Sequence, residues 1–382
     1  MKFPFIDLQA QRKTIRDEID AAVNRVIRHG AYILGPEVAQ FEGELAAFEN
    51  VGHVAACANG TDALKLPMLA WGIGGRENGK RNGERDAVFC PSFTYTATAE
   101  AIAVIGATPV FVDIDPDTYT MCPQSLQAAI DGMRRAGKLI PRAVVAVDLF
   151  GQSADYPAIA AITEAEDLKL ISDNAQSLGC RLNGHSSARW ADVATTSFFP
   201  AKPLGCYGDG GAMLTNDGAL TARLRDLAFH GRSSTPFDHD SIGLNSRLDT
   251  IQAAILLEKL KIFAREIDDR NAVAARYERA LNPLGVKTPT VIENGISTWA
   301  QYTVEIDNRD TFLDNMRAQE IPVAAYYPRP VHLQSAYTEF PISGNGLPVT
   351  EKAMHTVAAL PMHAYLTREN QDMVIEAVAK SI

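Results

Sequence analysis

The sequence predicts an α/β protein with a mainly parallel central sheet flanked by helices, together with a smaller C-terminal α+β domain. Short apolar segments alternate with helical segments between residues 87 and 175. Strands that are buried on both faces have this composition, because helices cover both sides of a parallel sheet. A long helical pattern over about 248–283 is followed by shorter strand and helix patterns. We therefore expect a large domain at 1–255 and a small domain at 256–382.

Composition narrows the possible classes of protein. The chain has 382 residues, of which 46% are hydrophobic, and its net charge is -10, which argues against general nucleic-acid binding. Its five cysteines are widely spaced and form no CxxC pair, and all of them except Cys122 are expected to be free thiols. The eight histidines are scattered, so no metal site is expected. The N-terminus lacks the apolar core of a signal peptide, and no run of about 18 apolar residues occurs. We expect a cytoplasmic protein.

The segments before the sheet begin with helices at 8–29, with Gly30 as the cap, and at 37–49. A strand at 53–57 leads into a glycine turn and a helix that Thr61 or Asp62 is expected to cap. The glycine- and charge-rich stretch 72–86 is expected to be an exposed loop, and it lacks the pattern of a nucleotide P-loop.

The remaining elements follow from apolar periodicity and from breaks at glycine and proline. Strands are expected at 87–90, 109–112, 143–147, 168–172, 300–306 and 321–327, with an apolar run at 194–199. Helices are expected at 96–106, 124–136, 156–166, 217–229, 309–319 and 367–380. A polar loop at 238–249 precedes the long helical pattern.

Ligands of such sheets bind at the carboxyl ends of the strands. The residues that follow the expected strands are Asn59-Gly60-Thr61, Ser92-Phe93-Thr94-Tyr95, Asp148, Asp173-Asn174-Ala175-Gln176, and Ser197 with Lys202. This edge collects a lysine, carboxylates, hydroxyl groups and an aromatic ring. We infer that the functional site lies there.

Lys202 stands out because an apolar run precedes it and four glycines follow it within nine residues. One interpretation is a lysine on a tight turn that forms a Schiff base with a carbonyl cofactor. The other is a surface lysine in a glycine-rich hairpin. The stretch by itself does not decide between them.

Pyridoxal 5′-phosphate would find a partner for each of its groups at this edge. Lys202 would supply the amine, and Asp173 at a buried strand end would keep the pyridine nitrogen protonated. Tyr95 could stack on the ring, whereas Gly60, Thr61 and Ser197 could donate to the phosphate. Each has an ordinary alternative: Asp173 could cap a helix, Tyr95 could pack in the core, and the turn at Gly60 could be structural only.

The motifs together resemble those of the DegT/DnrJ/EryC1/StrS family of sugar aminotransferases, which have the aspartate aminotransferase fold (fold type I of the pyridoxal-phosphate enzymes). The resemblance runs from Phe5 to near the C-terminus. Its most specific segments are Ser197–Gly211 and Asn245-Ser246-Arg247-Leu248-Asp249. It also includes Tyr32–Val38, Asn59–Leu64, Thr94–Thr98, Val112–Pro116 and Asp173–Ser177.

The resemblance implies a role for each matching residue. Lys202 would carry the cofactor, Asp173 would pair with the pyridine nitrogen, and Gln176 would contact the ring hydroxyl. Tyr95 would stack on the ring, and the phosphate would be held by Gly60, Thr61, Ser197 and, from the neighbouring subunit of a homodimer, Asn245. Residues expected near the substrate are Arg247, Tyr327 and, as a further candidate, His332. Ser172 and Asn174, on either side of Asp173, depart from the usual acidic residue and alanine.

The reaction implied is transamination of a nucleotide-linked keto sugar with L-glutamate as donor, in amino-sugar biosynthesis for lipopolysaccharide. The resemblance is greatest to enzymes that act at C3 of a UDP-2-acetamido-2-deoxy-3-keto-hexose or its uronic acid. Two alternatives remain open: a C4 aminotransferase on a dTDP-, GDP- or UDP-4-keto-6-deoxy sugar, and a regulatory protein on the same fold. The regulatory alternative predicts loss of the lysine, the aspartate or the phosphate turn, and all three are present.

Overall fold

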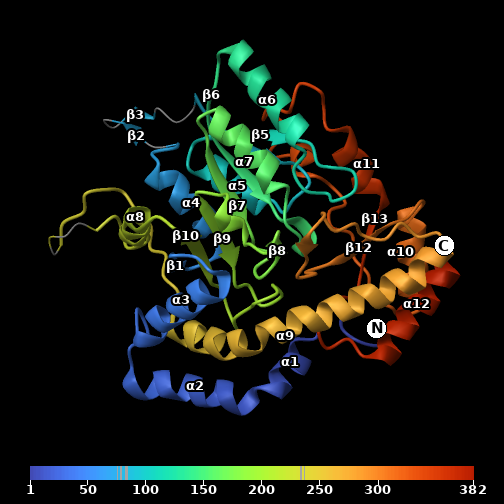
Figure 1. Ribbon diagram of the computed structural model, residues 1–382. Coiled ribbons are helices and arrows are strands. Elements are labelled where there is room, and N and C mark those ends of the chain that lie inside the picture. The colour runs from blue at the N-terminus through green and yellow to red at the C-terminus, as the bar shows by residue number, and fades with distance from the viewer. Residues whose placement is uncertain (75, 78–79, 82–84, 233–234, 236) are drawn as a thin grey trace.

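The computed structural model describes residues 1–382 except 75, 78–79, 82–84, 233–234 and 236. Within these residues the centre is a seven-stranded sheet in the order β1-β10-β9-β7-β6-β4-β5 (Figure 1). The strands are β1 (His53–Cys57), β4 (Asp86–Pro91), β5 (Thr108–Val112), β6 (Ile140–Val147), β7 (Lys169–Asp173), β9 (Val193–Ser197) and β10 (Gly211–Thr215). The pairs from β9 through β5 are parallel, and β10 is antiparallel to both of its neighbours. The expected mainly parallel sheet is confirmed.

Helices cover both faces of this sheet, which explains its almost wholly apolar strands. Along β4, for example, Val88 and Cys90 pack on one side, whereas Ala87 and Phe89 pack on the other. Helices on the first face are α4 (Gly60–Ala70), α5 (Ala97–Val104) and α8 (Gly218–Ala228). Helices on the second face are α3 (Pro36–Glu49), α6 (Pro123–Ala136), α7 (Tyr156–Ala165) and the first half of α9 (Thr250–Leu281).

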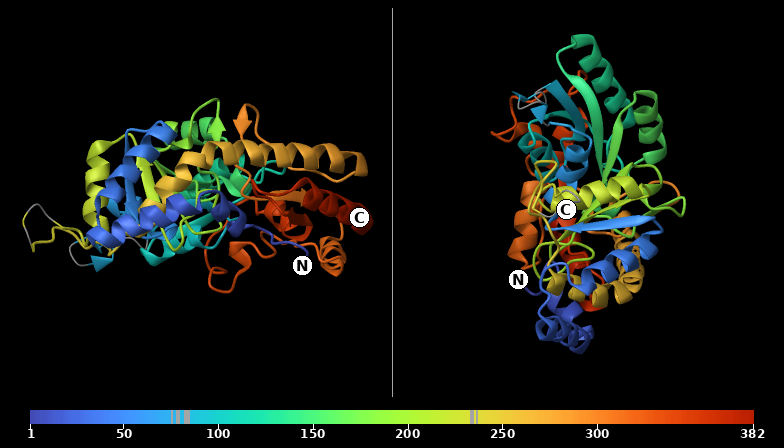
Figure 2. Two further views of the ribbon diagram at one scale, coloured as in Figure 1. Left: turned by 90° about the horizontal axis from the view of Figure 1, so that it is seen from below. Right: turned by 90° about the vertical axis from the view of Figure 1, so that its left-hand side faces the viewer.

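The 32-residue helix α9 connects the two ends of the molecule. It runs from the neighbourhood of α3 to the C-terminal elements, and its long axis is visible in Figure 1 and in the left view of Figure 2. The N-terminal helices α1 (Leu8–Thr14) and α2 (Arg16–His29) lie beside it, and Gly30 caps α2 in the left-handed conformation. The single helix expected over 8–29 is therefore wrong, because Ile15 adopts a non-helical backbone and interrupts it.

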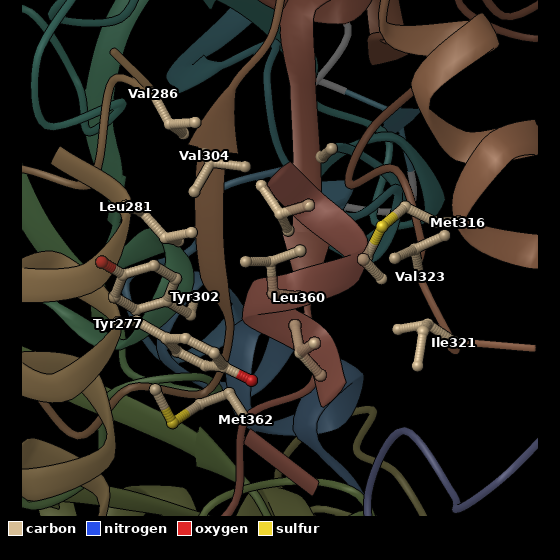
Figure 3. Packing of buried hydrophobic residues seen from close by; sticks show 14 of the residues in the cluster. Tyr277, Leu281, Val286, Tyr302, Val304, Met316, Ile321, Val323, Leu360 and Met362 are labelled. Carbon is tan, nitrogen blue, oxygen red and sulfur yellow. The ribbon is translucent and has the colours of Figure 1, made fainter. Parts of the chain in front are cut away.

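The C-terminal part packs around its own core. The two-stranded sheet β12 (Tyr302–Glu305) and β13 (Val357–Leu360) is flanked by α10 (Arg309–Ala318), α12 (Arg368–Ser381) and the second half of α9. Figure 3 shows the aromatic rings of Tyr277 and Tyr302 facing the aliphatic side chains of this core, with ring centroids 5.0 Å apart. Helix α11 (Pro348–Thr356) precedes β13.

Three further expectations need correction. The segment 321–327 is not a strand, since only Ala324 forms a bridge, to Ala359 of β13. Helix α4 is capped by Asn59, which accepts from the Asp62 backbone N–H at 2.8 Å, and not by Thr61 or Asp62. The stretch 72–86 contains the short hairpin β2 (Arg76–Glu77) and β3 (Lys80–Arg81), and the rest of that expected loop lies in part outside the described residues.

Two smaller findings complete the fold. Strand β8 (Arg181–Leu182) pairs with β11 (Gly295–Ile296), which joins the sheet domain to the segment after α9. In the described part of the chain, no helix is both long and apolar enough to cross a membrane.

Candidate active site

Lys202 lies in the connection between β9 and β10, as either interpretation of its glycine-rich sequence required. Its side chain is half-buried, unlike that of an exposed hairpin lysine. Its backbone N–H donates to Phe199 O at 2.8 Å, which closes a turn after β9. Burial lowers the pKa of the Lys202 ammonium, and the nearby Asp173 carboxylate partly offsets this effect. A larger neutral fraction makes this amine a better nucleophile and proton carrier.

Asp173 ends β7 and is buried. It does not cap a helix: its Oδ1 accepts from the Ala175 backbone N–H, and its Oδ2 accepts from the Thr98 hydroxyl, both at 3.1 Å. Burial raises the pKa of this carboxyl, whereas the Ala175 N–H, the Lys202 charge and the Thr98 hydroxyl lower it. A cationic N–H placed against the carboxylate would complete its pairing and stabilise the charged form.

Three aromatic and amide side chains lie next to Asp173. Gln176 accepts from the Phe150 N–H at 2.8 Å through Oε1, and its Nε2 donates to the Tyr327 hydroxyl at 3.2 Å. The rings of Tyr327 and Tyr95 lie with centroids 6.4 Å apart. Tyr95 is 58% exposed, so the alternative that it is a core residue is wrong. Its ring is available to a flat ligand.

The turn at the start of α4 meets the end of β9. A Cβ placed on Gly60 would lie 2.6 Å from Ser197 Cβ, so only glycine permits this approach. Ser197 Oγ accepts from the Phe199 N–H at 3.3 Å, which ties it to the turn of Lys202. Thr61, in the first turn of α4, is half-buried beside Gly60. Free N–H groups of the helix start and hydroxyl groups thus converge, which suits a phosphate.

The expected substrate residues lie in three places. Tyr327 belongs to the cluster around Asp173. Arg247 and Asn245 form a second group, in which the guanidinium donates to the Asn245 amide oxygen and lies 4.7 Å from the Phe229 ring centroid. His332 is buried, and its Nδ1 lies 2.7 Å from the Ser92 hydroxyl at the end of β4.

Sequence reasoning gave no role to a polar network behind Asp173. Asp148, which is fully buried, accepts from Tyr156 Oη at 2.8 Å and from Ser177 Oγ at 2.9 Å. Its own backbone N–H donates to Asp173 O at 3.1 Å. The two departures from the family pattern, Ser172 and Asn174, belong to this network, which also includes Tyr156 and Ser187. The one indication of this network in the sequence was that Ser172 and Asn174 are polar residues at the end of an apolar strand.

Thr98 is a second residue that sequence reasoning missed. It lies in the first turn of α5, where it can reach the Asp173 carboxylate at the end of β7. It belongs to the Thr94–Thr98 segment that follows β4, but residue spacing does not reveal which hydroxyl of that segment turns toward the sheet.

These residues fit pyridoxal phosphate. The buried Asp173 carboxylate accepts hydrogen bonds but forms no ion pair with any residue that the structure describes. The half-buried Lys202 lies close enough to affect its pKa, and Gly60 and Ser197 bring backbone close to the start of α4, where an anion could bind. A lysine and a buried carboxylate in this arrangement, at the carboxyl edge of such a sheet, define a pyridoxal-phosphate-dependent enzyme of the aspartate aminotransferase fold.

Comparison with known proteins supports the same class of enzyme. The model of the DegT/DnrJ/EryC1/StrS aminotransferase family matches residues 13–379, and the chain belongs to this family. The chain is 46% identical over 374 residues to the UDP-2-acetamido-2-deoxy-3-oxo-D-glucuronate aminotransferase of Pseudomonas aeruginosa, covering 98% of this chain and 99% of that relative.

Solved structures give the same result. The fold matches a DegT DnrJ EryC1 StrS aminotransferase from Brucella abortus with a TM-score of 0.95 and 48% identity, over 99% of both chains. It also matches NtdA from Bacillus subtilis, solved with bound cofactor PMP, with a TM-score of 0.86 and 26% identity over 99% of this chain and 85% of that one. The protein is a pyridoxal-phosphate-dependent sugar aminotransferase.

Proposed function

We propose that this enzyme transfers the amino group of L-glutamate to C3 of a UDP-2-acetamido-2-deoxy-3-keto-hexose, most specifically its uronic acid. The observation that carries the proposal is the half-buried Lys202 beside the buried Asp173, in a chain whose Pseudomonas relative acts on a 3-oxo-glucuronate. The similarity to that relative extends over 98% of this chain and 99% of the relative.

Lys202 would hold the cofactor and, once released from it, carry a proton at Nζ between donor carbon and cofactor. Its lowered pKa supports this role, because a base works best when its pKa lies near the working pH. Pyridoxal phosphate, when bound, supplies an electron sink for the carbon that loses its proton. Asp173, oriented by Thr98, would hold the proton on the pyridine nitrogen.

The remaining side chains would orient the reactants. Tyr95, exposed beside Tyr327, would cover one face of the ring, and Gln176 would donate to the ring hydroxyl. The helix start at Gly60 and Thr61, with Ser197, would hold the phosphate. These contacts would hold the cofactor ring and the reacting group in a fixed orientation.

The homodimer is part of the proposal. Asn245 and Arg247 contact each other beside Phe229. A second subunit would bring Asn245 to the phosphate, and Arg247 would offer a guanidinium to an anionic group of the sugar nucleotide or of glutamate. His332, buried next to Ser92, is a further candidate for substrate contact.

The central claim is tested with the purified enzyme and pyridoxal phosphate. The wild type is expected to be yellow, and borohydride is expected to fix the cofactor to Lys202, as peptide mass spectrometry would show. A folded Lys202→Ala variant is expected to be colourless and to resist fixation. Wild-type protein that binds no cofactor at saturating concentrations would overturn the assignment.

The sugar is tested separately. The enzyme loaded with the amino form of the cofactor is offered a panel of UDP-, dTDP- and GDP-linked 3-keto and 4-keto sugars, and the return of visible absorbance is followed. The proposal expects the fastest return with the UDP-linked 3-keto uronate. Faster turnover of a 4-keto-6-deoxy sugar would instead establish a C4 aminotransferase.

A further inference from the structure

Lys259 of α9 is buried in an environment that ordinarily disfavours a lysine. Its side chain is only 1% exposed, and burial lowers the pKa of its ammonium to about 8, with Glu266 and Cys206 acting in the opposite direction. Among the described residues, no carboxylate forms an ion pair with it. Burying an unpaired cation costs stability, so such a lysine needs another reason to be there.

Both close partners of Lys259 belong to the turn that carries Lys202. The Lys259 Nζ donates to Gly205 O at 2.6 Å, and it lies 4.5 Å from the ring centroid of Tyr207. Gly205 follows Lys202 by three residues. A charge-assisted hydrogen bond and a cation–π contact are therefore directed at one short segment of backbone.

A second side chain of α9 contacts the same segment. Gln252 Oε1 accepts from the Tyr207 backbone N–H at 2.8 Å. Gln252 and Lys259 are seven residues apart, which places them on one face of the helix two turns apart. The long helix thus holds the C-terminal half of the turn by two polar contacts.

The turn itself leaves little freedom around Gly205. A Cβ at this position would lie 2.5 Å from Pro200 O, and the Cys206 N–H donates to Phe198 O at 2.8 Å. The Lys202 N–H in turn donates to Phe199 O. Because these backbone groups pack against one another, a shift of the Gly205 carbonyl would also move Lys202.

We propose that Lys259 is a positioning residue for Lys202: by holding the Gly205 carbonyl and the Tyr207 ring, it fixes the turn so that the Lys202 amine meets the cofactor carbonyl. The proposal rests on the function proposed for Lys202. Lys259 acts through the turn and does not itself touch the reacting atoms.

The test compares Lys259→Met, which keeps the length and apolar stem of the side chain, with Lys261→Met. Lys261 lies on the same helix but is exposed, and it pairs with Glu258 at 2.6 Å, so it controls for loss of a lysine from α9. Cofactor is removed from each folded protein, pyridoxal phosphate is added back, and the rate at which visible absorbance returns is measured. The rate of the half-reaction with L-glutamate is then measured in the same samples.

Lys259→Met is expected to regain its visible absorbance about tenfold more slowly than wild type. It is also expected to react with glutamate about tenfold more slowly at saturation, with KM changed by less than about twofold. The reason is that misplacement of a reacting group lowers the rate more than it weakens binding. The midpoint of the pH titration of the cofactor's visible absorbance is also expected to shift. Lys261→Met is expected to match wild type, and Lys259→Arg to lie between wild type and Lys259→Met.

A folded Lys259→Met with wild-type rates and an unshifted midpoint would overturn the proposal. If Lys259→Met does not fold, Lys259→Gln decides: slower cofactor attachment at an unchanged KM supports the positioning role, and wild-type rates overturn it. Failure of the wild type to bind pyridoxal phosphate would instead overturn the proposed function, which keeps the two outcomes apart.

Discussion

Replacement of Asp148 by asparagine is expected to change how the stability of this enzyme depends on pH. Asp148 is fully buried at the end of β6. Burial raises the pKa of its carboxyl from 3.8 to about 7, and the Asp173 carboxylate adds to the increase, whereas hydrogen bonds from Ala154, Tyr156 and Ser177 oppose it. An asparagine at this position has the same shape and does not ionise.

The sign follows from comparing the folded and unfolded chains. Below pH 3.8 the carboxyl is protonated in both states, so it adds no pH dependence. Between pH 3.8 and about 7 it is neutral only in the folded chain, and stability is lost as the pH rises. A change from pH 5 to pH 8 crosses about two pH units of this interval, which corresponds to a loss of about 3 kcal/mol in the free energy of unfolding.

The measurement is equilibrium unfolding in urea at pH 5 and pH 8, at one protein concentration and with saturating pyridoxal phosphate. The stability of Asp148→Asn relative to wild type is expected to rise by about 3 kcal/mol between these pH values. Effects of pH on groups that do not interact with Asp148 occur in both proteins and cancel. Asp268→Asn, at an exposed position of α9, controls for the substitution itself. A difference that is constant within about 0.5 kcal/mol would refute the reasoning.

Three further outcomes are expected. Asp173→Asn should lower the rate of the half-reaction with L-glutamate by about 10²-fold or more, because the pyridine nitrogen loses its charged partner, and a loss below about tenfold would contradict this role. Gly60→Ala should weaken pyridoxal phosphate binding by about tenfold in a fluorescence titration, since the new Cβ lies 2.6 Å from Ser197 Cβ; an unchanged dissociation constant would mean that the two segments separate freely. Phe89→Ala, at a site with 0% exposure in β4, should lower the free energy of unfolding by about 3–5 kcal/mol in urea, and a value under about 1 kcal/mol would show that the core closes around the cavity.

Local sequence was sufficient for the parallel strands of the main sheet and for β1, whereas the antiparallel strand β10 was not predicted. Their apolar composition reflects burial on both faces, and this burial holds whichever strand lies alongside. The same reasoning failed at 321–327, where only Ala324 forms a bridge, because apolar residues there are buried without continuous strand pairing. It also failed at Ile15, since a helical pattern continues across a break that only the backbone reveals.

Some residues of the candidate site were also predicted from the sequence, whereas the contacts of others required the folded chain. Lys202 and Asp173 were accessible from the sequence, because a lysine among glycines and a carboxylate after a buried strand are local signals. The sequence showed Ser172 and Asn174 as departures from the family pattern, but only the folded chain showed their contacts with Tyr156 and Ser187.

The sequence by itself determined the type of sheet, the edge that carries the chemistry, and the lysine at its centre, because each depends on residues near one another in the chain. Only the tertiary structure decided that β10 lies antiparallel between β1 and β9, which places Gly60 against Ser197. It alone placed Lys259 of α9 beneath the turn of Lys202. The physical reason is that hydrophobic periodicity reports which face of an element is buried, whereas the partner that buries it is chosen by packing between distant segments.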